Sequence, residues 1–138
     1  MLLGALAFAT VMLLMFGVLT AVYRHANPRC SEQVIAEAGS PGGSWTAALM
    51  ERQCGENVPP VTHLNLRPVK APLELGYFTG AATEGQIFLI PLDARAASAV
   101  VEWNAPDELT VRCAGCLRNT PSQQETRWNG VKIRYLPR

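Results

Sequence analysis

The first pattern in the chain is an uninterrupted run of apolar residues near its N-terminus. Residues 2–23 carry no charge, and a helix needs about 20 such residues to cross the hydrocarbon core of a bilayer. A cleaved signal peptide is the alternative, but it normally has a basic start and a small residue where this chain has Leu19 in Leu19-Thr20-Ala21. We therefore expect residues 1–23 to be an uncleaved transmembrane anchor and residues 24–29 a juxtamembrane linker.

The rest of the chain alternates short apolar runs with turn residues, which is typical of β-structure. All ten prolines and nine of the eleven glycines follow the apolar run. The pattern predicts one all-β domain over residues 30–138, a small antiparallel meander or sandwich of about seven strands. Trp45 and Trp103 fall on predicted strand faces and should be in its core. The predicted strands are 33–38, 44–53, 61–66, 86–92, 98–104, 109–113 and 131–136.

Two segments predict tight turns between neighbouring strands. In Ser40-Pro41-Gly42-Gly43, proline presets the turn and glycine accepts the left-handed backbone that closes a hairpin. Residues 104–108 predict a second hairpin in the same way. In the last predicted strand Val131, Ile133 and Tyr135 alternate with other residues at a period of two, so they should share one buried face.

The segment around the first turn resembles a group of bacterial domains. Cys30 is followed by Ser40-Pro41-Gly42-Gly43-Ser44-Trp45, by Glu51-Arg52-Gln53-Cys54-Gly55 and then by Thr62. These residues are similar to small exported or anchored domains that carry a cysteine, a Ser-Pro-Asp-Gly-x-Trp hairpin and an acidic-Arg-x-Cys-Gly segment, with aspartate where this chain has Gly42. The resemblance covers residues 30–66 and, more faintly, 103–111 and the closing strand. It implies a Cys30–Cys54 disulfide, a periplasmic setting and no established activity.

The four cysteines form two pairs with different interpretations. A hairpin places its two ends side by side, so Cys30 and Cys54 should lie within bridging distance on geometric grounds as well. The spacing of Cys113 and Cys116 suits a redox dithiol, half of a zinc site or a local structural disulfide. Haem attachment is excluded because Leu117 stands where histidine is required. Since a strand precedes Cys113, rather than the helix start that activates a thiol, we expect a structural bridge.

Two signals disagree about the side of the membrane on which the domain lies. Arg24 and Arg29 follow the apolar run and no basic residue precedes it, which by the positive-inside rule favours the cytoplasm. Four cysteines in so small a domain favour an oxidising compartment instead. We give the cysteines more weight and expect a single-pass protein of the inner (cytoplasmic) membrane with its C-terminal domain in the periplasm.

Charge and motifs give little support for catalysis or nucleic-acid binding. The net charge is +1, and the 12 basic residues are scattered along the chain, so no surface for a phosphate backbone is indicated. His25 and His63 have no ligand or catalytic spacing, and Asp107-Glu108 lies in a predicted turn, where solvated acids are common. We expect no nucleic acid as a partner, no enzyme activity, no catalytic residue, no metal and no cofactor.

Two long segments, 68–85 and 114–129, do not fit a minimal sheet and are candidate contact surfaces. Loops of this length in compact domains are usually functional or disordered. Trp128 is either an exposed contact residue or a buried anchor of its loop. The candidate contact residues in the two segments are Tyr77, Phe78, Arg127 and Trp128.

These features together favour a binding role. In the anchor Ala5 and Ala9 form a small-residue face that allows close helix packing, so the expected partners are membrane lipid and other membrane protein subunits. The most concrete hypothesis is an accessory or assembly subunit of a larger membrane protein complex. The alternatives are a periplasmic protector or inhibitor that binds a toxin or hydrolase, and a thiol-disulfide redox protein that uses Cys113 and Cys116.

Overall fold

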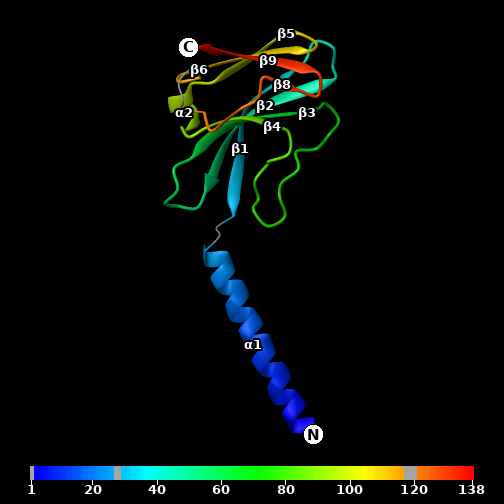
Figure 1. Ribbon diagram of the computed structural model, residues 1–138, viewed down its shortest axis with the longest axis vertical. Coiled ribbons are helices and arrows are strands. Elements are labelled where there is room, and N and C mark those ends of the chain that lie inside the picture. The colour runs from blue at the N-terminus through cyan, green and yellow to red at the C-terminus, as the bar shows by residue number, and fades with distance from the viewer. Residues whose placement is uncertain (1, 27–28, 117–120) are drawn as a thin grey trace.

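A long helix and a β-rich domain follow one another along the chain in the computed structural model (Figure 1). The structure describes residues 2–26, 29–116 and 121–138, without the side chains of residues 2, 3 and 5. The helix α1, Leu2–Ala26, contains a segment, Leu6–Ala26, that is apolar and long enough to cross a membrane, with a mean hydropathy of 2.2. None of its most apolar window is buried against the domain. Residues 27 and 28 of the predicted linker lie outside the described residues.

The domain contains two β-sheets that share one hydrophobic core. The first sheet has the strand order β1-β2-β3-β4-β7, and the second has the order β5-β6-β9-β8. The strands of the first sheet are β1 (Cys30–Gly39), β2 (Trp45–Cys54), β3 (Val61–Pro68), β4 (Gln86–Ile90) and β7 (Gln123–Gln124). Those of the second are β5 (Val100–Ala105), β6 (Glu108–Cys113), β8 (Arg127–Trp128) and β9 (Val131–Pro137). The short helix α2 (Ala94–Ala97) connects β4 to β5.

The all-β domain after an N-terminal helix is confirmed, and each of the seven predicted strands is present. Two strands were not predicted, because β7 and β8 are only two residues long. The second sheet is mixed, since β6 and β9 pair in parallel with Leu109 opposite Ile133. Parallel neighbours need a crossover connection, and the chain supplies one through β7 in the first sheet and β8 in the second.

The hairpin of β1 and β2 forms at the predicted turn. The backbone nitrogen of Gly43 donates to the Ser40 carbonyl at 2.9 Å, and Gly43 has φ +66°, which glycine adopts without strain. The Ser40 hydroxyl also accepts from the backbone nitrogen of Trp45 at 3.1 Å. The register places Cys30 opposite Cys54, and a disulfide joins them. The turn and the crosslink therefore hold the two ends of the hairpin.

The core lies between the two sheets and is built from alternating strand residues. Val131, Ile133 and Tyr135 of β9 are buried in it, and the residues between them are exposed, as the period of two predicts. The other buried core residues are Ala47, Leu49, Leu64, Leu66, Ile87, Phe88, Ile90, Ala97, Leu109, Val111, Cys113 and Cys116.

Polar atoms of large side chains tie the two sheets together at the edges of this core. The Trp103 indole of β5 donates to the Ala38 carbonyl of β1 at 2.9 Å. The Tyr135 hydroxyl donates to the Glu125 carbonyl at 2.7 Å and lies 3.3 Å from the Ile87 carbonyl of β4. Trp103, like Trp45, is half-buried and packs against the core from its margin. Trp45 and Trp103 therefore lie at the margin of the core and not at its centre.

Candidate functional site

A second buried cluster lies on the face of the first sheet that points away from the core. Ala48 and Met50 of β2 are fully buried there, although neither belongs to the core between the sheets. The segment that covers them is residues 69–85, here called the covering loop, which contributes the buried Ala81 and Ala82. Both faces of this sheet are therefore buried at its centre, and the covering loop is part of the packed structure.

A buried carboxylate joins three strands to the covering loop. Glu32 of β1 has a side chain that is only 2% exposed, and its Oε1 accepts hydrogen bonds from Arg52 Nε at 2.6 Å and from the Ala82 backbone nitrogen at 2.8 Å. Its Oε2 lies 2.7 Å from Nε2 of the fully buried His63. Arg52 also donates to the Ala82 carbonyl at 3.0 Å and to Gln86 Oε1 at 2.9 Å. We call Glu32, Arg52 and His63 the charged cluster, and it holds both backbone groups of Ala82.

Burial and hydrogen bonding set the protonation states in the charged cluster. Burial alone would raise the pKa of Glu32, but the hydrogen bonds from His63, Ala82 and Arg52 together hold it below its ordinary value. Burial lowers the pKa of His63 and outweighs the attraction of Glu32. His63 is therefore neutral and donates its Nε2 proton to Glu32. Its Nδ1 has no hydrogen-bond partner among the described residues, so a second proton there would be an unpaired buried donor.

The charged cluster has the groups of a proton-transfer site but not the access that such a site needs. A general base has to come within hydrogen-bond reach of its substrate. Glu32 and His63 lie beneath the covering loop, and the side-chain atoms of His63 are fully buried. The geometry therefore assigns these residues to positioning the loop.

We expect the free energy of unfolding of the full chain to fall as the pH is lowered from neutrality. His63 binds a proton less readily in the folded protein than in the unfolded chain. Its contribution to the free energy of unfolding is therefore fully present above pH 6.5 and is lost as the pH falls below that value. The lowered pKa of Glu32 adds a second loss as the pH falls below 4.5. Urea unfolding in detergent micelles at a series of pH values measures both.

A His63→Gln variant is the control for this prediction. The glutamine amide still donates to Glu32 but takes up no proton. The loss of unfolding free energy that begins below pH 6.5 should therefore disappear, while the loss below pH 4.5 remains. The only other histidine, His25, lies on α1 outside the domain. An unchanged upper fall in the variant would contradict the assignment to His63.

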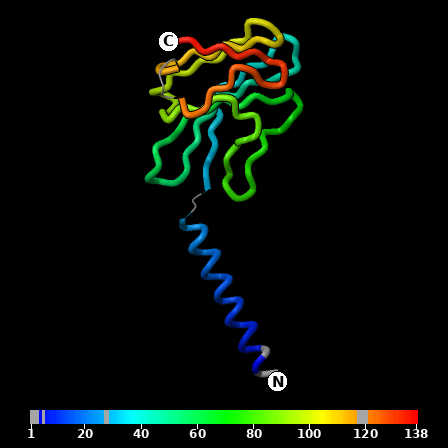
Figure 2. The backbone as a smooth tube through the Cα atoms, in the orientation of Figure 1, coloured from blue at the N-terminus to red at the C-terminus, as the bar shows by residue number. Residues whose placement is uncertain are grey.

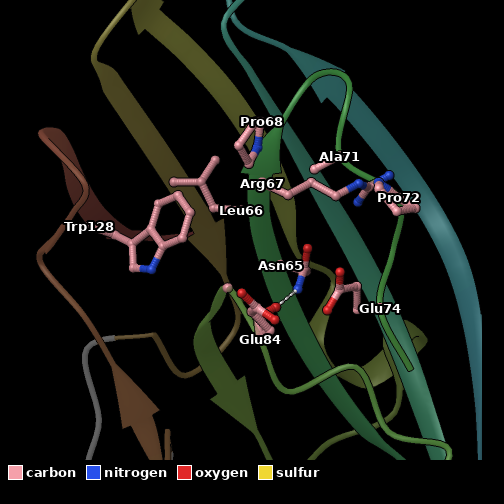
Figure 3. A pocket seen from close by; sticks show the side chains of 10 residues that line it. Asn65, Leu66, Arg67, Pro68, Ala71, Pro72, Glu74, Glu84 and Trp128 are labelled. Atoms are coloured by element: carbon pink, nitrogen blue, oxygen red, sulfur yellow. Dashed lines mark hydrogen bonds between the residues drawn. The ribbon is translucent and has the colours of Figure 1, made fainter. Parts of the chain in front are cut away.

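A shallow pocket lies where the covering loop leaves β3 (Figure 3). Its volume of about 80 Å³ has room for a few waters or one side chain, whereas small-molecule sites occupy about 300 Å³ or more. It is lined by Asn65, Leu66, Arg67 and Pro68 of β3, by Ala71, Pro72, Glu74, Glu84 and Gly85 of the covering loop, and by Trp128 of β8. The pocket is therefore smaller than a typical small-molecule site.

Two buried polar atoms of the pocket residues have no hydrogen-bond partner among the described residues, namely Asn65 Oδ1 and Arg67 Nη1. The Asn65 amide nitrogen donates to the Glu84 carbonyl, as Figure 3 shows, and the other terminal nitrogen of Arg67 pairs with Glu37 at 2.7 Å. Buried polar atoms without a partner are rare in proteins. Because both atoms are buried, the pocket does not present them to an incoming group.

The predicted contact residues lie in different places. Tyr77 and Phe78 are exposed at the turn of the covering loop and do not line the pocket. Trp128 lines the pocket and is half-buried, because its ring packs edge to face on Trp45 with 5.3 Å between centroids. It anchors its segment and remains accessible at the pocket. Arg127 is exposed, and residues 117–120 of the same predicted loop lie outside the described residues.

The remaining predicted residues are on α1 and in the second cysteine pair. Ala9 is exposed, while the side chain of Ala5 lies outside the described part of the chain. Cys113 and Cys116 form a disulfide, and both are buried in the core, with 0% and 1% of their surface exposed. Among the described residues no group of three or more histidine, cysteine or acidic side chains is arranged to hold a metal ion.

No protein family matches this chain, and no curated protein or solved structure shows significant similarity to it. The resemblance carried by residues 40–45 and 51–55 stays a prediction. The interpretation of the site rests on its own geometry.

The charged cluster was not predicted from the sequence, although a signal for two of its members was present. Once Cys30 is placed opposite Cys54, a period of two puts Glu32 opposite Arg52 on the same face, as the register confirms. Opposite charges at such positions attract each other. His63 could not be found in this way, because its place depends on the register of β3, which no crosslink or tight turn sets.

Proposed function

We propose that this protein is a single-pass, membrane-anchored, non-enzymatic binding domain that serves as an accessory or assembly subunit of a larger membrane protein complex. The observation that carries the proposal is α1, whose most apolar window has no burial against the domain. An apolar surface of this size is rarely left in water. Lipid and neighbouring helices are the surroundings that would bury it.

The disulfides support a location of the domain outside the cytoplasm. All four cysteines are paired, in Cys30–Cys54 and Cys113–Cys116, and disulfides persist in oxidising compartments. For a bacterial protein of the inner membrane this compartment is the periplasm. Arg24 and Arg29 are a charge bias of only two residues in the other direction.

Two features favour binding over chemistry. A redox enzyme needs a disulfide that a thiolate can reach, whereas Cys113 and Cys116 are buried in the core. The pocket beside Trp128 has a volume of about 80 Å³, which is too small for a typical substrate but has room for one side chain of a partner protein.

Affinity capture through a C-terminal tag tests the proposal. We expect a stoichiometric set of membrane proteins to accompany the full chain after gentle detergent extraction without reductant. Ala9→Leu should reduce the amount of captured partner protein, because the larger leucine side chain would prevent another helix from packing closely against the small-residue face of α1. Mass spectrometry of the eluate measures the outcome.

Ala7→Leu is the matched control for this experiment. Ala7 lies on the opposite side of α1 from Ala9, since two residues along a helix turn through about 200°, and the substitution is the same. Capture should survive it. Recovery of the unsubstituted protein alone, or an equal loss in both variants, would reject the subunit assignment.

A further inference from the structure

We propose that Tyr77 and Phe78 form a second membrane contact, an aromatic tip that enters the lipid headgroup region beside α1 and holds the domain against the bilayer. The aromatic tip is the turn of residues 76–81 in the covering loop. This inference rests on the proposed anchoring of α1, and it adds the surface of the domain that faces the lipid. Neither side chain takes part in the pocket or the charged cluster.

The two rings are unusually exposed for a soluble surface. Tyr77 is 84% exposed and Phe78 is 72% exposed, more than any other large apolar residue in the described part of the domain. They stack edge to face with 4.9 Å between centroids and so form one continuous apolar surface. Leu75, just before the turn, is 53% exposed and extends this surface. Adjacent exposed aromatic rings indicate an interaction site.

The turn that carries the rings is closed by its own backbone. The Gly76 nitrogen donates to the Ala81 carbonyl at 2.9 Å, and the Gly80 nitrogen donates to the Gly76 carbonyl at 2.7 Å. Gly80 has φ +68°, a conformation that other residues rarely adopt. Ala82, directly after the turn, is held by the charged cluster. The rings are therefore already ordered and lose little conformational freedom on binding.

The position of the aromatic tip follows from its contact with the first residue of β1. The Cys30 backbone nitrogen donates to the Thr79 carbonyl at 2.7 Å, and Gly80 packs directly on the Cys30 backbone. Cys30 comes four residues after Ala26, the last residue of α1, which limits their separation to about 14 Å. The tip therefore stays near the end of α1 whatever the inclination of the domain, and Figure 2 shows the covering loop directed toward that end.

The end of α1 marks the membrane surface on the proposed anchoring. The uncharged stretch of residues 2–23 has 22 residues, or about 33 Å of helix at 1.5 Å per residue, which covers a hydrocarbon core of about 30 Å. Ala26, which follows Arg24 and His25, then lies in the headgroup region. Tyrosine is enriched there, because its ring is apolar and its hydroxyl finds polar partners. A lipid surface is thus the occupant that fits both the chemistry and the place.

The test measures the depth of the aromatic tip in vesicles of pure phospholipid that contain the full chain and no other protein. A nitroxide is attached at Leu75→Cys, next to the native rings, and its accessibility to oxygen is compared with its accessibility to a water-soluble nickel chelate. A control label is placed at Asp107→Cys, in the turn between β5 and β6, which Figure 2 shows at the far end of the domain from α1. The native cysteines are all in disulfides and do not compete for the label.

We expect the label at position 75 to favour oxygen and the label at position 107 to favour the nickel chelate. In a Tyr77→Ser/Phe78→Ser variant the label at 75 should become as accessible to the chelate as the label at 107. Fluorescence-detected unfolding should be unchanged, because both rings are exposed.

Three results would overturn the inference; vesicle flotation identifies the first, and a measurement in native membranes separates the other two. Protein that does not float with the vesicles has no anchor, so the proposed function fails as well. Protein that floats with an aqueous label at 75 keeps its anchor but has no lipid contact at the tip. A label that is aqueous in pure lipid and protected in native membranes would assign the tip to a protein partner instead.

Discussion

Replacing Glu32 with alanine is expected to destabilise the domain by roughly 3–5 kcal/mol, the usual effect of breaking a buried ion pair by removing one partner. The substitution leaves the guanidinium of Arg52 without a counter-charge, although only 9% of that side chain is exposed. It also removes the acceptor for the Ala82 nitrogen and for His63 Nε2. Urea unfolding of the full chain in detergent micelles, followed by tryptophan fluorescence, measures the change.

Glu37→Ala is the matched control for Glu32→Ala. Glu37 lies on the same strand and also pairs with an arginine, Arg67, at 2.7 Å, but 47% of its side chain is exposed. Ion pairs with this exposure contribute about 0–1 kcal/mol. Similar losses of unfolding free energy in the two variants would mean that the buried ion pair of Glu32 contributes no more to stability than the exposed pair of Glu37.

The loss at Glu32 should also appear as local motion of the covering loop. Glu32 binds the Ala82 nitrogen directly, and through Arg52 it also supports the bond to the Ala82 carbonyl. Amide hydrogen exchange should therefore accelerate in residues 69–85 before it does so in the core strands. A uniform change over the whole domain would point to a global effect instead.

Strand positions were predictable from the sequence because turns and period-two patterns are local signals. In β9 the alternation of Val131, Ile133 and Tyr135 predicted both the strand and its buried face. In β3 the same rule gives only half of the answer. His63 and Asn65 alternate with apolar residues as a solvent-facing row would, yet both are buried. The covering loop buries them, and its path over the sheet is a long-range property that no local pattern contains.

The parallel pairing of β6 with β9 was beyond the sequence analysis for a related reason. A sequence of short strands and turns predicts antiparallel neighbours, because consecutive strands usually pair. The segment 114–129 instead places two short strands, β7 beside β4 and β8 beside β9, in different sheets. Pairs of two residues leave no recognisable pattern. The pocket beside Trp128 was hidden with them, since it forms only where β8 meets β3 and the covering loop.

Removal of the first disulfide in a Cys30→Ser/Cys54→Ser variant is expected to lower the free energy of unfolding by about 3 kcal/mol. The crosslink closes a loop of 24 positions, and in the chain-entropy model it acts mainly by restricting the unfolded chain. Since both residues are only half-buried, serine should fit at either position. Far-ultraviolet circular dichroism should therefore remain unchanged while the urea midpoint falls.

Ser31→Ala provides the comparison for this variant. Ser31 lies beside Cys30 at the same end of the hairpin, where its exposed hydroxyl makes a hydrogen bond of 3.4 Å to the Gln53 carbonyl, so its replacement should change stability by less than about 0.5 kcal/mol. An equally small effect of the double serine variant would mean that the unfolded chain is already restrained at this hairpin. A large loss would show that the crosslink stabilises this end of the hairpin, where the Cys30 backbone also bonds to Thr79 of the aromatic tip.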